Sequence, residues 1–449
     1  MKRSLLSVVL ASWLVSVLGS NAEAIVPPFF SPAGGEHLVS FDGSLRTEWA
    51  NLDELRAVDA EERNLYVEYN LLPTIDFLFG PLVNRNQGSP KRIQDVKVDW
   101  DHAALREGKV ELPYHYEGTW ILSNEAAAKP VLDLPVPYSA KTVLTKGWKT
   151  CTDSEPEHQT EDFFWYFWDP KRPGCKHKDG QEFYTAHILI GAATPQTEKT
   201  YPEYDRLFRQ KGAEKELRLT IAFGYVEDPS KFNPEKDTDY GITQFREFVQ
   251  KFRAKWAKKL SLTEKPILQG EYRGADKPKL VIGRRFSGKV DGAQVTVSIV
   301  SAAGIDQMEL FAKSFAHDHD GLFAWFGHSR VGSGFDADRF EQMLKTTPEY
   351  LSLTDDYQII YWGGCNSYSY YSTPFFRLKG GTKNLDIIAN GLPSLFSLNQ
   401  ENAEIVVENF LNWQKRATYQ EITKAIEARA KAIGTKVLAV VLGDEDNAN

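Results

Sequence analysis

The C-terminal half of the chain alternates short apolar segments with segments of helical periodicity, and this alternation restricts the fold more than any other feature. Residues 217–225 (LRLTIAFGY), 322–326 (LFAWF) and 357–362 (YQIIYW) are almost continuously apolar, as is typical of strands buried on both faces. Residues 241–259 predict a helix. One face of that helix carries Phe245, Phe248, Val249, Phe252 and Trp256. Strands that alternate with helices predict an α/β domain, a mostly parallel sheet flanked by helices, over residues 213–449.

The other elements of this half follow from the same two periodicities. Further strands are predicted over residues 279–286, 294–300, 385–389 and 437–442, and further helices over residues 306–315, 335–344, 403–414 and 419–433. Aromatic side chains gather in residues 163–168 and 368–376. Such clusters are more often core than ligand platform, and we interpret both as core.

The N-terminal half has the alternation of half-buried strands. Apolar residues recur with period two between residues 95 and 122, first as Val96, Val98 and Trp100, then as Val110, Leu112, Tyr114 and Tyr116. This pattern predicts strand, turn and strand with one buried face. Further strands are expected near residues 131–136 and 187–191, between Pro- and Gly-bearing turns. We therefore predict a β-rich domain over residues 25–212, with a sandwich as one architecture and a binding or folding role.

Residues 1–24 have the three parts of a secretory signal. Lys2 and Arg3 give a positive start, residues 5–18 form an uncharged apolar run, and residues 22–24 (AEA) match the small-x-small cleavage pattern. The alternative is a membrane anchor, but an apolar run of about 14 residues is short of the roughly 20 that span a bilayer. We expect a mature chain that begins near Ile25, is exported to the periplasm or the medium, and has no membrane segment.

The charge balance of the chain bears on which classes of binding partner are expected. The formal net charge is −8, with 53 basic and 61 acidic residues, and no basic patch is evident. Nucleic acid and anionic membrane surfaces attract basic proteins, so neither is an expected partner.

The chain has three cysteines, so in an exported protein one of them remains after a single disulfide has formed. Cys151 and Cys175 are 24 positions apart in a loop-rich stretch, which favours a local disulfide. The alternative is a zinc site in which His158 and His177 join the two thiolates. Either arrangement leaves Cys365 as the unpaired thiol.

Two chemically useful residues follow two of the predicted buried strands. His328 lies in Gly327-His328-Ser329 after one strand, and Cys365 follows Gly364 after the next, 37 positions further on. The carboxyl ends of parallel strands meet at one edge of a sheet, so the two side chains should lie close together. A thiol beside an imidazole can lose its proton and act as a nucleophile. The main-chain N–H groups of Cys365 and Ser329 could then hold the oxyanion.

This block order resembles that of the clan CD cysteine peptidases, the caspase, gingipain, legumain and separase group. The resemblance covers about residues 215–449 and implies a caspase-like domain in which His328 is the catalytic histidine and Cys365 the nucleophile. It also implies that residues 384–396 help to wall the substrate pocket, that the substrate is a polypeptide, and that no cofactor or metal takes part. The sequence departs from the group at Ser329, where glycine is usual.

Several alternatives accompany this interpretation. The domain could be a catalytically silent adhesion or scaffold module, with His328 a strand-end residue and Cys365 a small buried hydrophobe. Gly327-His328-Ser329-Arg330-Val331 is similar to an esterase nucleophile elbow, although Val331 replaces the last glycine. Residues 317–320 (HDHD) offer metal ligands but are better interpreted as a polar loop. Residues 444–446 (DED) read as a solvated tail, with calcium binding as the alternative, and Asp228 as a turn residue that could contact a basic substrate.

Overall fold

The computed structural model describes most of the chain, with several gaps. The described residues are 29–30, 32–145, 147–160, 164–196, 200–226, 233, 238–267, 281–303, 306–329, 335, 337–346 and 356–443. The predicted signal, Asp228, Val331 and residues 444–446 lie outside them. Within the described segments, every helix falls short of the length and apolar character that crossing a membrane requires.

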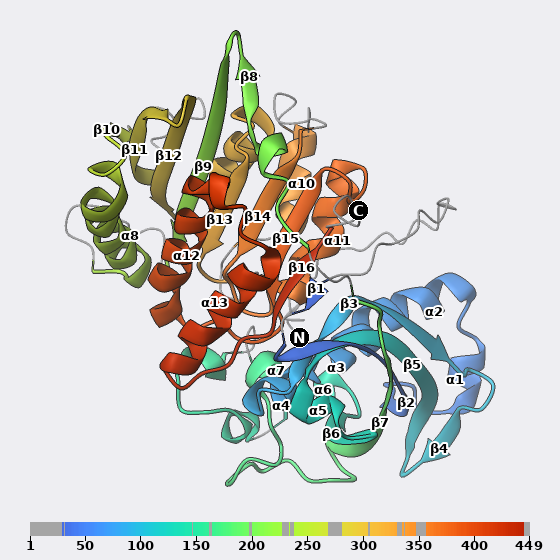
Figure 1. Ribbon diagram of the computed structural model, residues 1–449. Helices are drawn as coiled ribbons and strands as arrows, with labels where there is room; N and C mark the ends of the chain where they lie inside the picture. Colours follow the sequence, from blue (N-terminus) through green and yellow to red (C-terminus); the bar gives the residue numbers. More distant parts are fainter. Residues whose placement is uncertain are drawn as a thin grey trace.

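Two sheets divide the described chain, and helices accompany both, so the mixed α/β class is confirmed (Figure 1). The larger sheet has ten strands, nine of them in one continuous path from which β8 (Arg209–Lys211) branches at β9. In spatial order the path is β1 (Phe29–Phe30), β16 (Ala439–Leu442), β15 (Leu385–Asn390), β14 (Gln358–Trp362), β13 (Leu322–Phe326), β9 (Glu214–Gly224), β12 (Ala293–Ala302), β11 (Val281–Val290) and β10 (Thr263–Ile267).

The middle of this sheet consists of parallel pairs. Strand β9 pairs in parallel with β12 and β13, β13 with β14, and β14 with β15. Strand β16 and the β10–β11–β12 hairpins are antiparallel. The first described residues, β1, also join this sheet by pairing with β16, although they were expected in the N-terminal domain.

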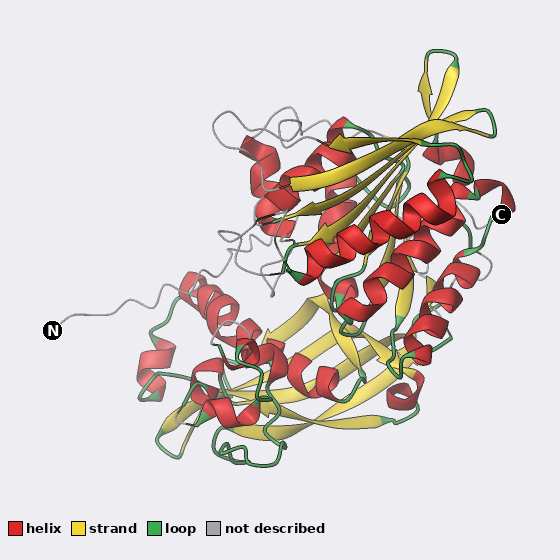
Figure 2. Cartoon of the chain, turned by 90° about the vertical axis from the view of Figure 1, so that its left-hand side faces the viewer, coloured by secondary structure: helices red, strands yellow, loops and turns green. Residues whose placement is uncertain are grey.

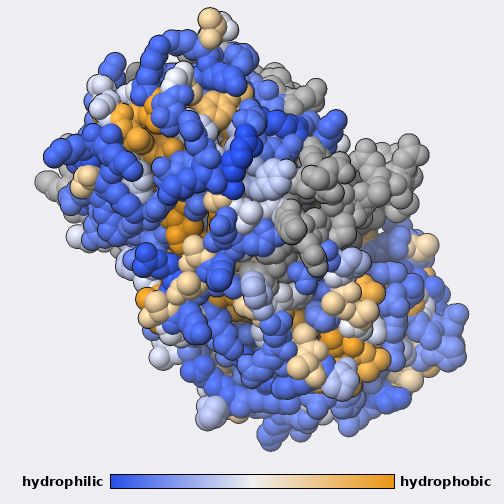
Figure 3. Space-filling model, in the orientation of Figure 1, coloured by the Kyte–Doolittle hydropathy of each residue, from blue (hydrophilic) through white to orange (hydrophobic). Residues whose placement is uncertain are grey.

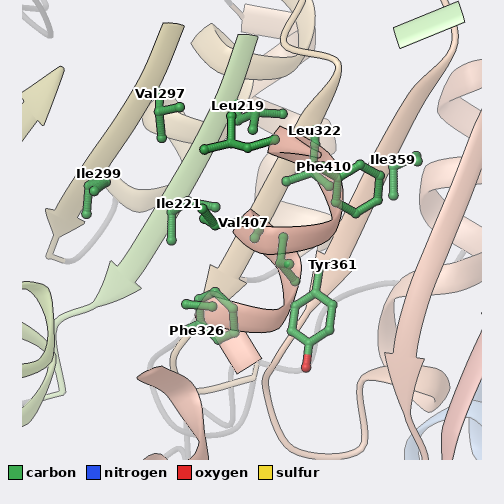
Figure 4. Packing of buried hydrophobic residues seen from close by; sticks show 14 of the residues in the cluster. Leu219, Ile221, Val297, Ile299, Leu322, Phe326, Ile359, Tyr361, Val407 and Phe410 are labelled. Carbon is green, nitrogen blue, oxygen red and sulfur yellow. The ribbon is translucent and has the colours of Figure 1, made fainter. Parts of the chain in front are cut away.

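Helices pack on both faces of the larger sheet, which explains why its central strands β13 and β14 are buried at every position (Figure 2). Leu322, Ala324 and Phe326 face one core, and Phe323 and Trp325 face the other. The first core is closed by α8 (Tyr240–Phe252), α12 (Asn399–Leu411) and α13 (Tyr419–Ala432); Figure 4 shows Val407 and Phe410 of α12 against the strands. The second is closed by α9 (Asp306–Ala312), α10 (Ala337–Thr346) and α11 (Ser367–Lys379).

The smaller sheet occupies the N-terminal half. Its path runs through β3 (Gly88–Val98), β5 (Lys109–Ser123), β2 (Gly34–Arg46), β7 (Phe183–Ala193) and β6 (Val131–Pro137), with β4 (Ala104–Arg106) pairing β5. The antiparallel pairing of β3 with β5 confirms the predicted strand, turn and strand. The short helices are α1 (Leu52–Arg56), α2 (Ala60–Tyr66), α3 (Leu72–Asp76), α4 (Phe79–Asn84), α5 (Asn124–Ala127), α6 (Ala140–Val143) and α7 (Phe164–Phe167).

A sandwich is not what the described N-terminal residues form. Leu71, Ile75, Leu78 and Leu82 are fully or almost fully buried against the sheet, in the same core as its inward-facing residues. Their spacing of three and four is helical, so residues 52–84 cover the apolar face with helices where a second sheet was considered. The molecular surface shown in Figure 3 is mostly hydrophilic, with small separate apolar patches.

The predicted disulfide is present. Cys151 and Cys175 are bonded to each other, and His177 lies beside them. His158, the fourth ligand of the zinc alternative, stacks on Phe167 and pairs with Asp153 at 2.7 Å. Because the two sulfurs are consumed in the bond, the zinc set is not assembled.

Most residues of the two aromatic clusters lie in the hydrophobic core. Phe164 and Trp168 are fully buried beside the disulfide, while Tyr368, Tyr371 and Phe375 of α11 are fully buried in the second core. The N-terminal half contributes Phe79, Ile121 and Tyr166 to that second core. The two halves therefore share packed interior at α11.

Candidate active site

His328 and Cys365 follow two adjacent parallel strands, and each lies the same number of residues beyond a pair of register partners. Trp325 of β13 is the register partner of Trp362 of β14, and each functional residue lies three positions beyond its tryptophan. The Gly363 N–H donates to the Trp325 carbonyl at 2.7 Å, which keeps the two chains together past the end of the strands. The Ser329 hydroxyl donates to the Cys365 carbonyl at 2.6 Å. The structure therefore brings the two predicted segments into direct contact.

Close approach explains the glycines. A Cβ on Gly364 would lie 2.6 Å from the Ser329 hydroxyl oxygen and 3.0 Å from the Gly327 carbonyl oxygen. A Cβ on Gly327 would lie 2.9 Å from the Trp325 ring and 3.1 Å from the Gly224 Cα. The shortest distance at each glycine is below 3.0 Å, so a side chain there would force neighbouring atoms to move, and glycine lets the strand ends of β9, β13 and β14 converge.

The loop after β15 touches both candidate residues. The Ser394 N–H donates to the Cys365 sulfur at 3.3 Å, and the Cys365 thiol lies 3.6 Å from the Ser394 carbonyl oxygen. Two residues further on, the Phe396 ring packs edge-on against the His328 ring, with the centroids 4.9 Å apart. A single short segment thus lines the thiol and the imidazole together.

Burial controls the ionisation of the thiol. Removal from water raises the pKa of Cys365, and the hydrogen bond from the Ser394 N–H opposes that rise because it favours the thiolate. Cys365 is the one free cysteine, since the other two form the disulfide. A thiol in this state needs a base to become a nucleophile at neutral pH.

Asn366 forms the turn that carries Cys365 into α11. Its backbone is left-handed, with φ +47°, and its side chain is fully buried. The Asn366 N–H donates to the Leu392 carbonyl at 3.0 Å and its side-chain amide to the Gly391 carbonyl at 3.2 Å. Its side-chain oxygen accepts from the Tyr166 hydroxyl, which comes from α7 in the other half of the chain.

Ser329 has a structural partner. It is buried, and its hydroxyl is directed at the Cys365 carbonyl. A serine in this arrangement would have to break that bond before attacking an ester.

In the HDHD segment, His317 ends the helical turn Lys313–His317, and residues 318–320 form a polar loop before β13, at the opposite end of that strand from His328. Asp320 is buried and accepts from Arg218 at 3.1 Å, from Thr220 at 2.5 Å and from Ser314. His319 pairs with Asp356 at 3.3 Å. Among the described residues, the one group of three or more ligand-type side chains close enough for a metal is that of Cys151, Cys175 and His177.

Comparisons of the chain with protein-family models, with curated proteins and with solved structures found no match. The site is therefore interpreted from its own geometry.

Proposed function

We propose that this protein is an exported cysteine peptidase with a caspase-like catalytic domain, in which Cys365 and His328 form the dyad. The observation that carries the proposal is that the two residues occupy matching positions at the ends of neighbouring strands. They stand on neighbouring parallel strands, three residues beyond paired tryptophans, and one loop contacts both side chains. The order of elements is strand, Gly-His, helix, strand, Gly-Cys, helix, strand and lining loop. It contains the Gly-His and Gly-Cys blocks in the order on which the resemblance to the clan CD peptidases rests.

The proposed reaction is hydrolysis of a peptide bond in two steps. His328 accepts the Cys365 proton, and the thiolate attacks the carbonyl carbon of the scissile bond. His328 then donates the proton to the leaving amine as the carbon–nitrogen bond breaks. Water, deprotonated by His328, hydrolyses the acyl thioester and restores the thiol. The N–H groups of Cys365 and Ser329 stabilise the oxyanion. Gly327 and Gly364 let the two strand ends that carry these groups approach each other closely.

The disulfide supports the exported location. Disulfides persist in oxidising compartments, and Cys151 and Cys175 form one in the N-terminal half. A polypeptide is the expected substrate, and the chemistry needs no cofactor or metal.

Paired substitutions separate the peptidase from the esterase alternative. Cys365→Ala should remove peptide hydrolysis, because no other described residue of the site supplies a thiol. Ser329→Ala removes a hydrogen bond to the Cys365 carbonyl and is expected to slow peptide hydrolysis by roughly 3- to 30-fold without abolishing it. The measurement is turnover of a peptide and of a short acyl ester by both variants. Loss of ester turnover in Ser329→Ala, with full turnover in Cys365→Ala, would establish the esterase instead.

A further inference from the structure

Tyr166 is a residue of the N-terminal half that reaches the candidate active site. It lies on α7, within the loop that the Cys151–Cys175 disulfide closes. Its ring is buried and stacks on Phe79 at 6.0 Å between centroids. Its hydroxyl donates to the side-chain oxygen of Asn366, the residue directly after Cys365.

We propose that Tyr166 is a positioning residue for Cys365 and acts through Asn366. The proposal rests on the proposed role of Cys365 as nucleophile. It gives the N-terminal half a function at the active site, because that half supplies the hydroxyl that fixes the turn beside the thiol.

Both polar atoms of the Asn366 side chain are hydrogen-bonded. It is fully buried and uses its amide on the Gly391 carbonyl and its oxygen on the Tyr166 hydroxyl. Without the phenol, a buried carbonyl oxygen is left without this donor, which costs more than the hydrogen bond itself contributes. Asparagine tolerates the left-handed turn at φ +47° better than most residues, and these bonds fix its side chain within that turn.

The same bonds connect Asn366 to the loop that holds the sulfur. Asn366 bonds Gly391 and Leu392, and Ser394 in that loop donates its N–H to the Cys365 sulfur. A second contact from the N-terminal half supports this loop, since the Ser89 hydroxyl donates to the Gly391 carbonyl at 2.9 Å. A shift of Asn366 therefore moves Cys365 and its Ser394 partner relative to each other.

The ionisation of the thiol reports this shift without any need for a substrate. Titratable groups on the neighbouring elements include His328 after β13, Tyr166 on α7 and Tyr370 on α11. Burial is the largest influence on Cys365 and raises its pKa, ahead of the opposing Ser394 bond. Loosening the turn admits water, so the pKa of the thiol should fall toward its ordinary value even as the geometry for catalysis worsens.

The test measures the rate at which iodoacetamide alkylates Cys365 as a function of pH in the full mature chain. Tyr166→Phe, Asn366→Gly and the double variant are compared with the wild type; glycine keeps the left-handed turn and removes only the side chain. We expect a lower midpoint and alkylation about 3- to 10-fold faster at pH 7 in each variant, by the relation of one pKa unit to a tenfold change in thiolate. The double variant should match Asn366→Gly, because both changes break one connection.

Tyr204→Phe is the matched control. Tyr204 is equally buried, and its hydroxyl donates to the Ala417 carbonyl at 3.0 Å in a part of the chain that does not contact Cys365. It should alkylate like the wild type. An unchanged or higher midpoint in Tyr166→Phe, additive effects in the double variant, or an equal change in Tyr204→Phe would each overturn the proposal.

The peptidase assay is a separate readout. If the wild type cleaves peptides, Tyr166→Phe should lower kcat by about 10-fold or more with little change in KM, since misplacement of a reacting group by a fraction of an ångström costs rate and not binding. If the wild type cleaves nothing, the alkylation series still decides whether Tyr166 positions the thiol. Failure of the proposed function and failure of this inference are thus distinguishable.

Discussion

His328→Ala is expected to slow peptide hydrolysis at pH 7 by about 10²- to 10⁴-fold, the range that general acid–base catalysis supplies. The reason is the environment of the thiol, because Cys365 is half-buried and has lost part of its contact with water. Burial raises the pKa of Cys365, so without a base nearby the thiol stays protonated at neutral pH. Below that raised pKa the thiolate fraction grows tenfold per pH unit, so the residual activity of the variant should climb steeply with pH. The measurement is kcat/KM between pH 6 and 10.

The matched control for this variant is His187→Ala. His187 is exposed on the smaller sheet and forms a hydrogen bond with Asp133 at 2.7 Å, so the substitution removes an imidazole bonded to a carboxylate away from the site. Its variant should keep wild-type activity. A His328→Ala rate within threefold of the wild type, or an equal loss in His187→Ala, would contradict the assignment of His328 as the base.

Replacing both Cys151 and Cys175 by serine is expected to lower the free energy of unfolding of the N-terminal half by about 3 to 4 kcal/mol. The bond closes a separation of 24 residues, and loop-closure entropy in the unfolded chain assigns roughly that value to a loop of this length. An exposed ion pair such as Lys97–Glu117 contributes below about 1 kcal/mol, so the disulfide effect stands clear of surface changes.

Urea unfolding followed by near-ultraviolet circular dichroism measures this loss, because Phe164 and Trp168 pack in the cluster that contains Cys151. The Lys97→Ala variant is the control and should shift the transition little. A loss below 1 kcal/mol in the double serine variant would mean that packing alone fixes this loop.

Most strands and helices of the C-terminal half could be predicted because their patterns are local, whereas β10 and α11 were missed. β13 and β14 are buried on both faces, and a short, continuously apolar run such as LFAWF is typical of such a strand. The positions of His328 and Cys365 followed, since each directly extends such a strand. The disulfide followed from spacing in a loop-rich stretch, with export as the reason to expect one.

The contacts that complete the site depend on residues far apart in the chain. Tyr166 and Asn366 are 200 positions apart, and neither periodicity nor motif links them. Ser394 and Phe396 lay within the range that the resemblance assigned to a pocket wall, but nothing local showed that one bonds the sulfur and the other packs on His328. The helices of residues 52–84 were missed because the alternating strands of the same half dominated the interpretation.

Cleavage of a peptide library by the purified mature chain, with Cys365→Ala beside the wild type, tests the central claim most directly. Under reducing conditions the wild type should cleave a defined subset of bonds, and the variant should leave all of them intact. A wild type that cleaves nothing, or a variant with the same cleavage profile, would contradict a Cys365 peptidase.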